Sequence, residues 1–181
     1  MKKIILTTAI ILSVITASLA QTVQPSANVT LNLKLHSVQS IVANAASVDL
    51  EYKTVNDYNA GVQSDQTNHL TVYSTGGFIV KVSSSVAQLS GSTGTDKIES
   101  SGITLTASKG AATITPAFSP VNLGTVKAPL ITSSIGGTDQ KFNVNYKAAG
   151  NNAYINKFFK GAVAADATVY STTVTYSIEA N

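Results

Sequence analysis

The chain has 181 residues, of which twelve are lysine and nine are acidic, and it contains neither arginine nor cysteine. Arginine is the residue best suited to bidentate contacts with phosphates and base edges, so its absence argues against nucleic-acid binding. Without cysteine the chain can form no disulfide, and it must depend on its hydrophobic core and hydrogen-bonded backbone for stability.

The first twenty residues have the pattern of a secretory signal peptide. Lys2 and Lys3 form a basic start, Ile4 to Thr16 is a nearly unbroken apolar run, and Ser18 to Ala20 offers small residues to a signal peptidase. The run is short for a membrane span, and no cluster of charges follows it. We expect export by the general secretory pathway, cleavage after Ala20, and a mature protein of one domain that does not span a membrane.

The mature region begins with an alternating segment, 21–37, that predicts a β-strand. Its apolar row is Val29, Leu31, Leu33 and Leu35, with polar residues between them. The apolar phase changes after Leu35, and the two residues that follow are unsuited to a tight hairpin turn. This strand either pairs within its own domain or reaches out to a neighbouring molecule, and the pattern leaves both arrangements open.

Short alternating segments recur through residues 38–181, each with one apolar and one polar face. They are Val48–Tyr52, Leu70–Val72, Phe78–Val82, Ile103–Ala107, Phe142–Tyr146 and Tyr170–Ile178. Between them, Ser83–Gly102 is interpreted as a long surface loop, and Pro116, Pro120 and Pro129 favour turns and edge strands. No segment has a sustained helical period. These features predict an all-β, immunoglobulin-like antiparallel sandwich.

The last alternating segment is the most regular one. We expect Val174, Tyr176 and Ile178 to face the core, or a groove beside it, and the intervening Thr173, Thr175 and Ser177 to face the other way.

The residues that usually carry chemistry are sparse. His36 and His69 are the only histidines, and neither has an acidic residue at metal-ligand spacing, so both are expected at the surface or at strand ends. Asp49, Glu51 and Lys53 share one face and predict a solvated strand. We expect no enzyme activity, cofactor or metal site, although a Ser–His–Asp triad assembled only in space stays an alternative.

Three segments together resemble the later strands of α-type fimbrial subunits, the pilins of the alternate chaperone–usher pathway. They are SGITLT (101–106), GTDQKFNVNYKA (137–148) and YSTTVTYSIEA (170–180). The N-terminal order is also similar, because NVTLNLKL (28–35) and VQSIVA (38–43) follow the signal peptide closely. One departure is that Asp166–Val169 lacks the glycine that the family usually places before the tyrosine of its last strand.

The resemblance implies a sandwich that lacks its final strand and whose groove is filled by a partner. A periplasmic chaperone would fill the groove first, and the N-terminal strand of the next subunit would follow at an outer-membrane usher, building a surface fimbria. The donor residues would then be Val29, Leu31, Leu33 and Leu35, and the groove edge would carry Val174, Tyr176 and Ile178. Two alternatives stay open: a monomeric surface protein that binds sugar or protein through its loops, and a hydrolase.

Overall fold

The structure is a computed structural model that describes residues 25–92, 94–158 and 167–181. The expected signal peptide and its cleavage site lie outside the described residues. The chain divides into a segment that ends at Lys34 and a compact unit, Leu35–Asn181. We call residues 25–34 the arm, and they contain neither helix nor strand.

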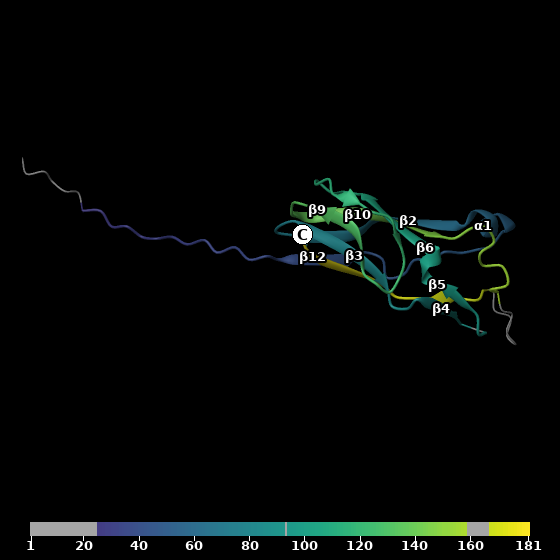
Figure 1. Ribbon diagram of the computed structural model, residues 1–181. Helices are drawn as coiled ribbons and strands as arrows, with labels where there is room; N and C mark the ends of the chain where they lie inside the picture. Colours follow the sequence, from purple (N-terminus) through teal and green to yellow (C-terminus); the bar gives the residue numbers. More distant parts are fainter. Residues whose placement is uncertain (1–24, 93, 159–166) are drawn as a thin grey trace, which may run out of the picture. The chain divides into compact units, whose positions relative to one another are not determined.

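The compact unit is almost entirely β and is built from antiparallel pairs, which confirms the predicted all-β sandwich. The first sheet has the order β1 (Gln39–Ala43), β2 (Val62–Ser74), β10 (Gly137–Ala148), β6 (Ile103–Lys109), β8 (Val121–Asn122). The second has the order β12 (Val174–Ala180), β3 (Phe78–Ser84), β9 (Ala128–Ser133), β7 (Ala117–Phe118). Figure 1 shows β9, β12 and the C-terminus at one end of this unit and α1 (Val55–Ala60) at the other.

The core lies between the two sheets and is formed by the inward rows of the alternating strands. Phe142 of β10 contacts Phe78 of β3 and Phe118 of β7, with ring centroids 6.4 and 6.1 Å apart. The fully buried apolar side chains include Leu70, Val72, Val80, Val82, Leu105, Leu123, Leu130, Ile131 and Val144. Period-two patterning therefore placed the core residues of β2, β3, β6 and β10, whereas Leu123, Leu130 and Ile131 lie in the stretch whose prolines favoured turns and edge strands.

The region expected as a long surface loop is partly ordered into strands. It contains β4 (Gln88–Gly91), β5 (Lys97–Glu99) and the short 3-10 helix η1 (Ser100–Gly102). β4 and β5 form a third sheet with β11 (Tyr170–Ser171). Leu89 is buried and lies opposite Ile98, so the prediction failed because pairing with β5 and β11 orders this Ser/Gly-rich stretch.

Two local features also differ from expectation. Residues 48–53 alternate in burial, but they form no strand ladder. The short helix α1 follows them, and its N-terminus is fixed by a capping box in which Thr54 and Asp57 bond each other's backbone. No helix in the described ranges is long and apolar enough to cross a membrane.

Pro129 lies inside β9, between β3 and β7, rather than at an edge. The pairing of β3 with β9 shifts register between Val80 and Lys81, at the level of Pro129. A bulge lets a strand accommodate a residue that cannot donate a ladder hydrogen bond. Pro116 and Pro120 do flank the short edge strands β7 and β8, as expected.

The final alternating segment is divided between two sheets. Tyr170 and Ser171 pair with β4, and the chain then crosses to pair with β3 from Val174 onwards. Val174, Tyr176 and Ile178 pack against the core while remaining partly exposed, and Thr173 and Thr175 are exposed. The predicted orientation of this segment is thus what the structure shows.

His69 was expected at the surface or at a strand end, and this prediction was wrong. It lies within β2 and is only 3% exposed. The pairing of β2 with β10 is irregular here, since Leu70 lies opposite Phe142 and Gln66 lies opposite Val144. The extra residues form a bulge, which turns His69 inward beside Leu70.

Candidate functional site

The open edge of the second sheet is formed by β12, which pairs with β3 alone among the strands that the structure describes. At the ends of this ladder the Ser85 amide donates to Thr173 O and the Asn181 amide donates to Gly77 O. Backbone groups alternate in direction along an antiparallel strand. The backbone N–H and C=O groups of Val174, Tyr176 and Ile178 therefore point away from β3, toward the unpaired edge.

A cavity of about 910 Å³ lies beside this edge. One wall is the chain that follows β1, Ala45–Lys53, and the other is Ala167–Val174. The floor contains Leu89, Ile98, Ile103, Leu123, Tyr146 and Ala148. Removing one leucine side chain from a core leaves a cavity of about 150 Å³, so this space has room for several such side chains.

A group of apolar side chains near the open edge packs on the core and remains partly exposed. Its members are Ile41, Val48, Leu50, Val174, Tyr176 and Ile178. Val174 and Tyr176 line the cavity directly, whereas Ile178 lies beyond it toward the end of β12. A partly exposed apolar group beside unpaired backbone groups is a surface suited to an added β-strand.

A buried polar group crosses the floor of this cavity. His69 Nε2 is 2.8 Å from the Tyr146 hydroxyl, which is 2.5 Å from the hydroxyl of Tyr176. The His69 ring meets the rings of Tyr146 and Tyr176 edge to face, and all three residues line the cavity. His69 Nδ1 is buried and has no hydrogen-bond partner. Strands β2, β10 and β12 each contribute one member, so the group connects both sheets.

An asparagine network holds the bulge that directs His69 inward. Asn68 has a positive φ of 50°, a conformation that asparagine tolerates better than most residues. The backbone amide of Asn68 donates to Asn143 Oδ1, and its side-chain Oδ1 accepts from the backbone amide of Ala111. Asn44 donates to Asn68 O through its side chain and to His69 O through its backbone. The inward position of His69 is therefore fixed by polar contacts on both sides.

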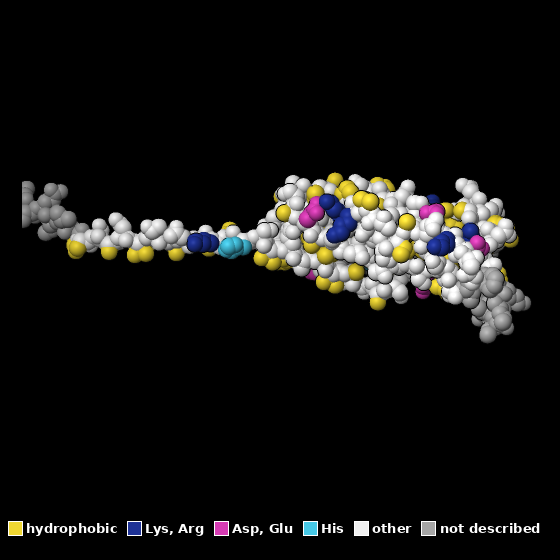
Figure 2. All heavy atoms as spheres, turned by 60° about the horizontal axis from the view of Figure 1, so that its bottom comes forward, with side chains coloured by type: hydrophobic (Ala, Val, Ile, Leu, Met, Phe, Trp, Pro, Cys, Tyr) yellow, Lys and Arg dark blue, Asp and Glu magenta, His cyan; other side chains and the backbone are white. Residues whose placement is uncertain are grey.

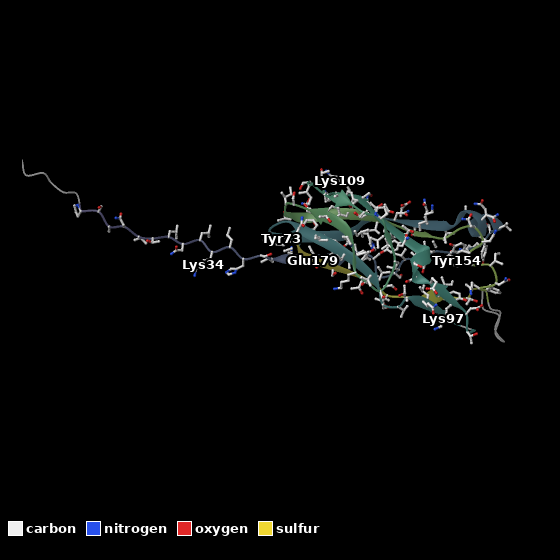
Figure 3. All side chains as sticks on the ribbon, viewed as in Figure 1. Lys34, Tyr73, Lys97, Lys109, Tyr154 and Glu179 are labelled. Atoms are coloured by element: carbon white, nitrogen blue, oxygen red, sulfur yellow. The ribbon has the colours of Figure 1, made fainter. Side chains whose placement is uncertain are left out.

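Three tyrosines form a cluster toward the α1 end of the cavity. The Tyr52 ring lies 5.2 Å from the rings of both Tyr58 and Tyr154. The hydroxyls of Tyr52 and Tyr154 donate to the carbonyls of Ala149 and Gly102. Figure 3 shows Tyr154 at the opposite end of the unit from Glu179. Burial raises the pKa of Tyr52 and Tyr154, and both remain neutral at physiological pH.

Of the charged residues that line the cavity, Glu51, Lys53 and Lys157 form ion pairs. Lys53 pairs with Glu51, and both are largely exposed, as expected for a solvated face. Lys157 Nζ lies 3.7 Å from Asp96 Oδ1. Figure 2 shows that charged side chains are scattered over the visible face and form no large patch there. In the described ranges no three His, Asp or Glu side chains meet in an arrangement that could hold a metal ion.

The predicted donor row lies in the arm and at the start of the compact unit. Val29, Leu31, Leu33 and Leu35 are 82–91% exposed. Four large apolar residues at alternating positions are therefore exposed, which favours a role in binding.

Sequence patterning identified Val174 and Tyr176 but missed His69 and most of the cavity floor. The one signal for His69 was the Asn68–His69 pair, because asparagine is enriched at positive φ and so marks a bulge. No protein-family model and no curated protein matches this chain.

Proposed function

We propose that this protein is a structural subunit of a surface fimbria, joined to its neighbours by β-strand addition. The observation that carries the proposal is the unpaired edge of β12 beside an open cavity that has an apolar floor and that Val174 and Tyr176 line. The occupant is residues 27–36 of a second copy of this chain, whose alternating apolar row is exposed.

The strand order supports this assignment. An immunoglobulin sandwich carries strands A, B, E and D in one sheet and C, F and G in the other. The order β1, β2, β10, β6 corresponds to A, B, E, D, and β12 beside β3 corresponds to F beside C. No described strand is hydrogen-bonded to β12 in the place of G, although β1 lies close beside β12. An added strand there would complete the sandwich.

The energetics favour a partner that fits the cavity closely. Each apolar side chain gains about 1.5–3 kcal/mol on full burial, and each edge hydrogen bond adds roughly 0.5–1.5 kcal/mol. Ordering the arm costs about 1–2 kcal/mol per residue, which offsets most of this gain. The net affinity therefore depends on how well the row Val29, Leu31, Leu33 and Leu35 fills the space beside Val174 and Tyr176.

The structure gives less support to the two alternatives. A sugar platform needs exposed aromatic faces. Tyr52 contacts Tyr58 and Tyr154, and all three are only partly exposed; of the described aromatic residues only Tyr73 and Phe158 are exposed, by 38% and 54%. A hydrolytic triad needs a carboxylate beside the histidine, but His69 is bonded to a tyrosine. A chaperone and an usher remain expected partners of the proposed assembly, as does delivery to the cell surface.

The experiment uses residues 21–181 as the intact protein and a variant that can accept a strand but not donate one. Leu31→Asp together with Leu33→Asp, which we call the acceptor variant, interrupts the apolar row of the arm. We expect the intact protein to form ladders of oligomers and the acceptor variant to be monomeric. A peptide of residues 27–36 should bind the acceptor variant and raise its melting temperature.

The control is the same peptide with both aspartate substitutions, which should not bind. Val174→Asp in the acceptor variant should abolish binding of the natural peptide. An intact protein that stays monomeric, together with an acceptor variant that ignores the natural peptide, would contradict the proposed function.

A further inference from the structure

We propose that His69 makes strand addition acid-sensitive, so that an added strand binds the groove only while this imidazole is neutral. The inference rests on the proposed function, because it concerns the same groove and the same occupant. It adds a regulatory input, the pH outside the cell, to an assembly held by apolar contacts and backbone hydrogen bonds.

The position of His69 is the first support. The side chain is 3% exposed and lines the cavity floor, under the space that the added strand would fill. Its Nε2 is bonded to Tyr146, and its Nδ1 has no protein partner. A protonated imidazole would carry a second N–H and a positive charge at this buried atom, and both need compensation.

The groups around His69 supply no such compensation. Tyr146 of β10 and Tyr176 of β12 face it, and burial raises the pKa of both hydroxyls, so they stay neutral across the relevant pH range. β1 contributes no titratable residue. The remaining titratable residues of the cavity lining are Asp49, Glu51, Tyr52, Lys53, Tyr58, Tyr154, Lys157 and Tyr170. No described carboxylate is bonded to His69, and Glu51 is paired with Lys53.

The effect of the occupant has a definite sign. Burial already lowers the pKa of His69 below its ordinary value in the open groove. Leucine and valine side chains seated over the imidazole replace water by hydrocarbon, which disfavours the charged form further. The occupied groove therefore binds a proton less readily than the open groove. By linkage, strand affinity is constant well above the lowered pKa of His69 in the open groove and falls as pH decreases through that pKa.

The chain allows a clean test because His36 and His69 are its only histidines. The acceptor variant carries His36→Gln in addition, and the probe is a peptide of residues 27–35 with both ends blocked. His69 is then the one histidine in the mixture. Affinity is measured by titration calorimetry between pH 7.5 and pH 5.0, with circular dichroism at each pH to verify that the domain is folded.

We expect the peptide to bind about three- to tenfold more weakly at pH 5.0 than at pH 7.5, with proton release on binding near the lower pH. His69→Gln and His69→Phe should each remove this dependence, and the first keeps a polar side chain of similar reach. A matched control, Asp49→Asn, should leave the dependence unchanged.

The possible failures are distinguishable. Binding that is equally strong at both pH values, or a pH dependence that survives both His69 substitutions, would overturn the role of His69 and leave strand addition intact. A peptide that binds at no pH would instead overturn the proposed function on which the inference rests.

Discussion

The two long edges of the sandwich are built in opposite ways. On one side β8 and β7 end their sheets as strands of two residues each, flanked by Pro116 and Pro120. Val121 is buried there. On the other side β12 ends its sheet with seven residues and contains no proline. Its inward side chains are only partly covered.

This difference teaches that the open edge is not a general weakness of the chain. Short strands and prolines are the usual means by which proteins protect sheet edges from pairing with other molecules. The chain uses both at β7 and β8 and neither at β12. The contrast indicates that the β12 edge is kept open for a partner, which supports the proposed strand addition.

The largest expected effect separates the two edges by truncation. Ile131→Ala removes a side chain of β9 that lies opposite Phe118 of β7 and is 0% exposed, and it should lower the free energy of unfolding by about 2–5 kcal/mol. Ile178→Ala on the open edge should cost about 1 kcal/mol, because this side chain is only partly buried. Urea unfolding of both variants measures the difference, and equal losses would show that the two edges are equally closed.

A charge placed on the open edge gives the next largest effect. Val174→Asp puts a carboxylate among apolar groups of the cavity and should cost about 1–3 kcal/mol. Thr175→Asp, one residue along and exposed, should change stability by less than about 0.5 kcal/mol. Thermal unfolding of the two variants checks this. Similar melting temperatures would refute the orientation of β12.

The smallest effect concerns the bulge that places His69 under the open edge. Asn68→Ala should cost about 1–2 kcal/mol, because alanine is strained at the positive φ of this position and the bond to Ala111 is lost. Asn68→Gly allows the positive φ without strain, so its denaturant midpoint should lie between those of the natural protein and Asn68→Ala. A destabilisation by glycine that equals or exceeds that by alanine would show that φ is not the controlling factor.

Much of the fold follows from sequence alone, since core burial alternates with the strand period. Phe142, Val144 and Tyr146 read as one inward face, and the structure places them there. The predicted loop 83–102 failed because composition does not reveal that two isolated apolar residues, Leu89 and Ile98, meet across a strand pair. The candidate site was predicted only in its outline, through Val174 and Tyr176. The position of Tyr176 beside His69 depends on strands that are far apart in the chain.

The sequence by itself determined that this protein is all-β, which residues face its core, and that an unusually regular apolar row precedes the domain. Each of these is a local property, because the direction of a side chain in a strand is set by its parity. Only the tertiary structure decided which sheet edge stays open and that a cavity lies beneath it. It also decided that His69 turns inward, since the bulge interrupts the alternation of β2 locally and the bonds that fix Asn68 come from Asn44, Ala111 and Asn143.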